Sequence, residues 1–191
     1  AALLAVHAGA LVAQQPVLTR AFELERQGSF AAAAEAYRTV LSARPAETAA
    51  LLGLERALVP LGRGTELIAA GRAALAADST SAAPYGVLVR AWAAEGRIDS
   101  ARAVTERWLR VSPGQEPPFR ELVGAELGRG AWGEAASDIA AARRRLGQPD
   151  ALAPEAAQVA VAQRDWMGSV REWIAAMHQL PGLRFAALAA L

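Results

Sequence analysis

The sequence repeats itself with a period of 34 residues, and this period constrains the fold more than any other feature. Helix-breaking or turn-forming residues recur at this step at Pro45, Ser79, Pro113, Gly147 and Pro181. Two further series keep the same step and register: Gly28, Gly62, Gly96, Gly130 and Arg164, and then Phe30, Gly64, Ile98, Trp132 and Trp166. Such a period is typical of arrays of small structural units that stack on one another.

Two segments with helical spacing lie between successive breakers. In the third unit, Tyr85, Leu88 and Trp92 recur at steps of three and four, which places them on one stripe of a helix. Gly96 follows, and glycine closes helices readily because it takes the left-handed backbone conformation. The second segment, RIDSARAVTERWLRVSP, ends at Pro113. Each unit is therefore predicted to be an antiparallel helix pair that is stable only when stacked on its neighbours.

This pattern resembles the tetratricopeptide repeat family. The family's early aromatic, turn glycine, small residue in the second helix and closing proline are visible in two units as Ala21, Gly28, Phe30, Ala33, Tyr37 and Pro45, and as Tyr85, Leu88, Trp92, Gly96, Ala101 and Pro113. The resemblance implies an all-α, right-handed superhelical solenoid of about five 34-residue helix-turn-helix repeats, with half-repeats at both ends. The predicted repeats span residues 14–47, 48–81, 82–115, 116–149 and 150–183, between an N-terminal apolar helical segment, 1–13, and a C-terminal partial helix, 184–191.

Individual positions refine this prediction. Small residues are expected where the second helix of a unit approaches the first closely, at Ala33, Ala101, Ala135 and Ser169. Glu126 departs from the family pattern because it occupies a site that is usually apolar. The tryptophans, at 92, 108, 132, 166 and 173, coincide mostly with the core series, so we expect them to serve packing and not ligand stacking.

Composition excludes several classes of protein. The 191 residues are 53% apolar and 20% charged, too hydrophobic for a disordered segment, and the net charge of +1 gives no electrostatic footprint for nucleic acid. No apolar run reaches the length of a membrane span. Cys, Lys and Asn are absent, which excludes a thiol nucleophile, a Schiff-base lysine and a Walker A loop.

No constellation of residues indicates catalysis. His7 and His178 lie at opposite ends of the sequence, and neither is spaced with other residues as metal ligands are. The run Arg143-Arg144-Arg145 falls late in a predicted helix, where cations complement the helix dipole. We therefore expect no enzyme activity, no cofactor and no metal.

A groove lined by the first helices is implied by the family resemblance. Counted from the core series, its lining residues are Thr19, Phe22, Arg26, Arg56, Ala83, Val87, Arg90, Arg120, Glu121, Gly124, Gln158 and Val161. Family members that hold a peptide's C-terminal carboxylate use Lys and Asn at such sites, and this chain has neither. An extended or helical peptide of modest polarity is the expected guest, and an unoccupied inner wall is the alternative.

The two ends look like unfinished layers of the stack. Apolar residues that would face a neighbouring layer are Leu3, Leu4, Val6, Leu11, Leu183, Phe185, Leu188 and Leu191. Three interpretations stay open: flanking parts of a longer protein, a signal remnant in the opening AALLAVHAGALVAQQP, or contact between copies. The leading hypothesis is head-to-tail self-association of an exported protein, periplasmic or extracellular, into a fibre or oligomer. The alternative is an adaptor that binds a protein or peptide in the groove.

Overall fold

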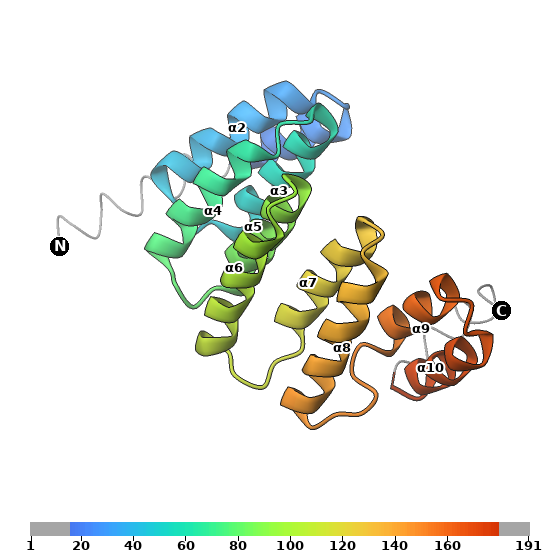
Figure 1. Ribbon diagram of the computed structural model, residues 1–191. Coiled ribbons are helices and arrows are strands. Elements are labelled where there is room, and N and C mark those ends of the chain that lie inside the picture. The colour runs from blue at the N-terminus through green and yellow to red at the C-terminus, as the bar shows by residue number, and fades with distance from the viewer. Residues whose placement is uncertain (1–15, 180–191) are drawn as a thin grey trace. The chain divides into compact units, whose positions relative to one another are not determined.

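The computed structural model describes residues 16–179, which are helical apart from short connections (Figure 1). A helix over residues 16–26 comes first. It is followed by α2 (Phe30–Ala43), α3 (Thr48–Leu58), the short 3₁₀ helix η1 (Val59–Leu61), α4 (Thr65–Ala77), α5 (Ala82–Ala94), α6 (Ile98–Val111), α7 (Pro117–Gly128), α8 (Trp132–Leu146), α9 (Ala153–Ala162) and α10 (Trp166–Gln179). No strand occurs within these residues, as the sequence predicts.

The chain divides into two compact units, Ala1–Ala101 and Arg102–Leu191, and the division falls inside α6. The 34-residue period continues through α6 without a break, so the sequence does not predict this division. The predicted boundaries of the 34-residue repeats stay a prediction. Within residues 16–179, no helix has both the length and the apolar character that crossing a membrane requires.

The glycine series marks a turn that recurs at the predicted period. The backbone φ is 73°, 67°, 72° and 72° at Gly28, Gly62, Gly96 and Gly130, and 61° at Arg164. In each turn the N–H of this residue donates to the carbonyl three residues before it, and the next N–H donates to the carbonyl five residues before. This is the Schellman closure of a helix, and it requires a left-handed residue. The predicted role of the glycines is therefore confirmed, and Arg164 takes the same conformation without being glycine.

The core of the first unit lies between its helices. Tyr37 of α2, Leu51 and Leu54 of α3, Leu67 of α4 and Val87 of α5 are almost completely buried in one cluster. Full burial of one such side chain stabilises the fold by roughly 1.5–3 kcal/mol. The helices themselves pack in sequence order, α2 on α3 and α4 on α5, with α3 also touching α5.

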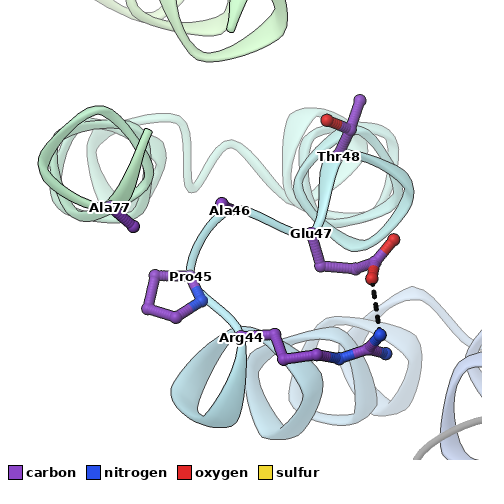
Figure 2. Close-up of a pocket in the computed structure, with 6 residues that line it drawn as sticks. All are labelled: Arg44, Pro45, Ala46, Glu47, Thr48 and Ala77. Carbon is purple, nitrogen blue, oxygen red and sulfur yellow. Dashed lines mark ion pairs between the residues drawn. The ribbon is translucent and has the colours of Figure 1, made fainter. Parts of the chain in front are cut away.

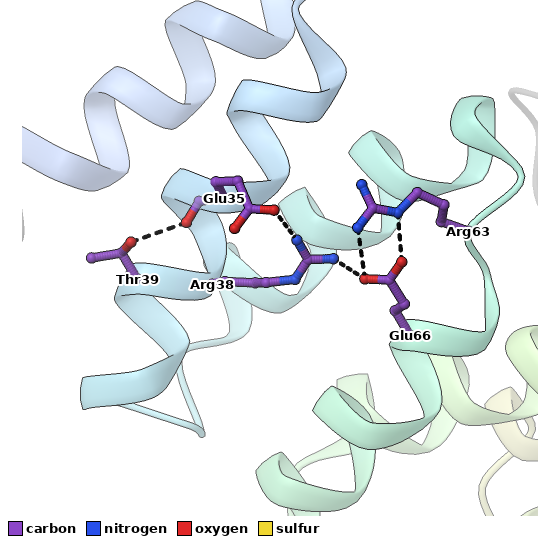
Figure 3. A network of polar contacts seen from close by, with 5 residues as sticks. All are labelled: Glu35, Arg38, Thr39, Arg63 and Glu66. Atoms are coloured by element: carbon purple, nitrogen blue, oxygen red, sulfur yellow. Dashed lines mark hydrogen bonds and ion pairs between the residues drawn. The ribbon is translucent and has the colours of Figure 1, made fainter.

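A polar network fixes α4 against α2 on the surface of the first unit. Arg38 of α2 contacts the carboxylates of Glu35 and Glu66, and Arg63 pairs with Glu66 at 2.5 Å (Figure 3). The hydroxyl of Thr39 donates to the backbone carbonyl of Glu35 at 3.0 Å. These groups are half-buried or exposed, so water screens their charges. The network is therefore a surface connection between α2 and α4, each of which is the second helix of its predicted repeat.

The second unit has its own core. One buried cluster contains Phe119 and Val123 of α7, Ile139 of α8, Leu152 directly before α9, and Val159 of α9. The predicted small positions are buried in both units: Ala33, Ala101 and Ala135 are fully buried and Ser169 nearly so. That prediction is confirmed.

Two of the tryptophans contradict the packing prediction. Trp108 and Trp173 are buried, but Trp132 is 38% and Trp166 62% exposed. These two are the first residues of α8 and α10. A side chain on a helix leans toward the N-terminus, so at the first position it extends past the end of the packed layer.

Candidate partner-binding face

The predicted groove residues of the first unit lie on the helix over 16–26, on α3 and on α5, and we call this surface the first-helix face. Thr19, Phe22, Arg26 and Arg56 are exposed. Arg90 and Ala83 are half-buried. Val87, which the sequence places in the groove, is fully buried in the core because α5 is enclosed by both α3 and α4. Its side chain therefore does not reach the surface.

The corresponding surface of the second unit is formed by α7 and α9. Arg120, Gly124 and Gln158 are exposed, and Glu121 and Val161 are half-buried. Contacts between α7 and α9 bring these residues onto neighbouring helices.

Two arginines of this face, Arg56 and Arg90, are held by carboxylates from the neighbouring first helix. Arg56 of α3 donates from Nε and Nη2 to the two carboxylate oxygens of Glu25, at 2.5 and 3.0 Å. Arg90 of α5 donates in the same bidentate way to Glu55 of α3, from Nε to Oε1 at 2.7 Å and from Nη2 to Oε2 at 2.8 Å. Two parallel N–H···O bonds fix the orientation of both side chains, so these pairs are more specific than single contacts.

The second unit has a similar pair on its own first helices. Arg120 of α7 donates from Nε to Glu155 of α9 at 3.1 Å, and it also pairs with Glu116 one turn earlier. In the pairs with Glu25, Glu55 and Glu155 the glutamate side chain is mostly covered and the arginine side chain is 38–50% exposed. The positive charge of each arginine is therefore largely offset at the surface.

The groove prediction includes the arginines but misses their partners. Glu25, Glu55 and Glu155 are absent from the predicted lining. The signal that could have found them is the spacing to their arginines, 31 or 35 residues, which is one repeat period give or take a few residues.

Glu25 also connects the surface to the core. The Tyr37 hydroxyl donates to its Oε2 at 2.5 Å, and the Arg56 guanidinium beside it holds the pKa of the Glu25 carboxyl below its ordinary value. Burial, with the Glu25 charge in addition, raises the pKa of the Tyr37 phenol. The phenol therefore stays protonated and donates to the carboxylate.

Phe22 is the apolar centre of the first-helix face. This residue is 38% exposed, and its ring meets the ring of Tyr37 edge to face, with 5.8 Å between centroids and 80° between planes. Thr19 and Arg26 lie one turn before and after it on the same helix, and both residues are exposed. A fixed aromatic ring beside an arginine is a common anchor at protein interfaces.

One open pocket of about 470 Å³ lies elsewhere in the first unit, at the turn between α2 and α3 beside the end of α4. Figure 2 shows its lining, in which the charged groups, Arg44 and Glu47, pair with each other at 2.8 Å. The rest of the lining is Pro45, Ala46, Thr48 and Ala77. The pocket offers no convergent set of polar groups, so it is not a candidate for chemistry.

The predicted assembly residues lie outside the described residues. They are Leu3, Leu4, Val6, Leu11, Leu183, Phe185, Leu188 and Leu191. Close to the second group in sequence, α10 carries exposed apolar side chains at Trp166, Met167 and Ile174, which are 62%, 67% and 46% exposed. Among the side chains that the structure describes, which end at residue 177, no three acidic or histidine residues are grouped as metal ligands would be.

Solved structures with the same arrangement of helices are tetratricopeptide repeat proteins. TTC0263, a thermophilic repeat protein of Thermus thermophilus, is 20% identical with a TM-score of 0.61, over 93% of this chain and 98% of that one. MamA is 17% identical with a TM-score of 0.57, over 89% and 93%. A repeat protein from Parabacteroides merdae ATCC 43184 is 12% identical with a TM-score of 0.58, over 93% and 70%.

These likenesses concern the fold, and at such identities they concern the fold alone. They confirm the predicted all-α tetratricopeptide repeat solenoid, while the number of repeats and the half-repeats at the ends stay predictions. No protein-family model matches the sequence, and no curated protein matches it.

Proposed function

Because this chain has the tetratricopeptide repeat fold, we propose that it is a protein-binding scaffold that takes its partner on the first-helix face. The observation that supports the proposal is Phe22, an exposed residue whose ring meets Tyr37 and which has Arg26 one turn later on its helix. Such a ring offers apolar contact area at little entropic cost, because Tyr37 already restricts it.

The charge pattern of the face limits the partner. Arg56 and Arg90 are each bound to a carboxylate of their own chain, whereas Arg26 is an exposed residue. We therefore propose a peptide segment, extended or helical, that places an apolar side chain on Phe22 and a carbonyl or carboxylate near Arg26. A strongly acidic segment would find few uncompensated arginines on this face.

A selected peptide tests the proposal. A random peptide library is displayed and selected on the purified chain, and the affinity of the recovered peptides is measured by calorimetry. Phe22→Ala is expected to weaken binding at least tenfold, which corresponds to about 1.4 kcal/mol. The matched control is Val111→Ala, because Val111 is an exposed apolar residue at the end of α6, a helix that is not part of this face. Equal affinity for the wild type and Phe22→Ala would contradict the proposal, as would a selection that yields no peptide.

A second candidate function is head-to-tail self-association, and the exposed apolar residues of α10 favour it. An exposed group of large apolar side chains is typical of an interaction site. In sedimentation velocity over a concentration series, this candidate predicts that the wild type associates and that Ile174→Arg stays monomeric. The control is Ala162→Arg, an exposed change on α9. A wild type that is monomeric at every concentration would exclude it. Export of the protein stays a prediction.

A further inference from the structure

The second unit contains a buried carboxylate that the first-helix face does not use. Glu126 of α7 is fully buried, at a repeat position that is usually apolar in the tetratricopeptide repeat family. Arg102 of α6 donates from Nη2 to its Oε1 at 2.5 Å. The other oxygen, Oε2, is buried and accepts no hydrogen bond among the described residues.

A second carboxylate shares the same arginine. Asp138 of α8 lies with Oδ2 at 2.7 Å from Arg102 Nη1, but without hydrogen-bond geometry, so this oxygen too is buried without a donor among the described residues. Glu126 and Asp138 thus lie against the two terminal nitrogens of the same guanidinium. One guanidinium on α6 therefore faces two carboxylates, one on α7 and one on α8.

The charges of the group do not balance if both carboxyls are ionised. Two negative charges then face one positive charge, and the surplus charge is buried. An ionised carboxylate is only an acceptor, so Glu126 Oε2 and Asp138 Oδ2 would both stay unsatisfied. A single proton on the pair resolves both problems, since it restores neutrality and supplies the missing donor.

Other carboxylates of the second unit have arginine partners of their own. Glu134 of α8, whose charge also faces Glu126, is exposed and pairs with Arg129 at 3.6 Å. On α6, Glu106 pairs with Arg145 of α8, and on α9, Glu155 pairs with Arg120. We propose that Glu126 and Asp138 share one proton in the folded chain, that this proton joins α7 to α6 and α8, and that pH thereby sets the stability of the second unit.

The direction of the pH effect follows from the Glu126 carboxyl. Burial first, and then the hydrogen bond and charge of Asp138, raise the pKa of Glu126 from 4.5 to about 8. The folded chain therefore keeps the proton up to about pH 8, whereas the unfolded chain loses it above about pH 4.5. The stabilisation is complete below about pH 4.5, declines as pH rises, and is lost once pH passes about 8.

The experiment compares urea unfolding of the wild type and Glu126→Gln from pH 5 to 10. Both carry Trp92→Phe, so that the remaining tryptophans all lie in the second unit. The glutamine amide at position 126 mimics the protonated carboxyl and cannot ionise. The equilibrium constant of unfolding of the wild type is divided by that of the variant at each pH. This ratio is expected to increase by up to about tenfold for each pH unit and to become constant above about pH 8. A ratio that is independent of pH would overturn the proposal.

A direct titration keeps the proposal testable if Glu126→Gln does not fold. In a chain labelled with ¹³C at the glutamate carboxyls, one resonance is expected to titrate near pH 8, far above the others. Asp138→Asn is expected to lower this midpoint, because it removes the neighbouring negative charge. If every glutamate carboxyl titrated at its ordinary value, the shared proton would not exist.

Discussion

Gly53 of α3 lies so close to the ring of Tyr37 of α2 that a Cβ at residue 53 would stand 2.2 Å from Cζ of the tyrosine. Tyr37 is fully buried and its hydroxyl is bound to Glu25, so the ring cannot turn aside without losing that bond. We expect Gly53→Ala to lower the free energy of unfolding by about 1–3 kcal/mol, in the range of other overpacked cores. Urea denaturation followed by circular dichroism measures this change.

A glycine with free space around it is the matched control. Gly124 lies inside α7, is exposed, and has no atom within 4 Å of the position of a Cβ. Because alanine restricts the unfolded chain more than glycine does, Gly124→Ala is expected to raise the free energy of unfolding by about 0.4–1 kcal/mol. The close packing inferred at Gly53 would be wrong if both substitutions were stabilising.

The recurring turn predicts opposite effects at two of its positions. Arg164 has a φ of 61°, which costs an L-residue with a Cβ about 1 kcal/mol. Arg164→Gly is therefore expected to raise the melting temperature, and Gly96→Ala, at a φ of 72°, to lower it. Differential scanning calorimetry of both variants checks the signs. A loss of stability in Arg164→Gly would show that its side chain contributes more than the backbone strain costs.

The pair of Glu25 and Arg56 predicts a loss of stability in acid. Arg56 lowers the pKa of the Glu25 carboxyl in the folded chain. The contribution of this pair to the free energy of unfolding is therefore complete above pH 4.5, and it is lost as pH falls through the pKa that Glu25 has in the folded chain. Glu25→Gln is expected to cost about 1 kcal/mol at pH 7, because half-exposed Arg56 is screened by water. Unfolding at pH 7 and at pH 2 checks this, and a cost that did not shrink at pH 2 would contradict it.

The helices and turns could be predicted because each depends on a short stretch of sequence. The turn at Gly28 needs only a left-handed residue after a helix, and a close contact such as that at Ala33 needs only a small residue at a fixed place in the repeat. These requirements recur along the chain, so the period makes them visible. Arg164 meets the same requirement against its own preference, because the helices on both sides fix the turn.

The surface could be predicted only in part, because it depends on residues one repeat apart. Position within the repeat indicates that Arg56 and Arg90 face outward, but not that Glu25 and Glu55 bind them. The sequence places Val87 in the groove because repeat numbering does not reveal that α5 has neighbours on both sides. The closeness of Gly53 to Tyr37 likewise depends on how two repeats pack.

Hydrogen exchange of the chain with a selected peptide tests the central claim, binding on the first-helix face, most directly. With the peptide bound, amides of residues 19–27 and of α3 are expected to exchange at least tenfold more slowly, while those of α2 and α4 near Arg38 and Glu66 keep their rates. The same peptide should give no protection in Phe22→Ala. Protection confined to α2 and α4, or unchanged by Phe22→Ala, would contradict the account.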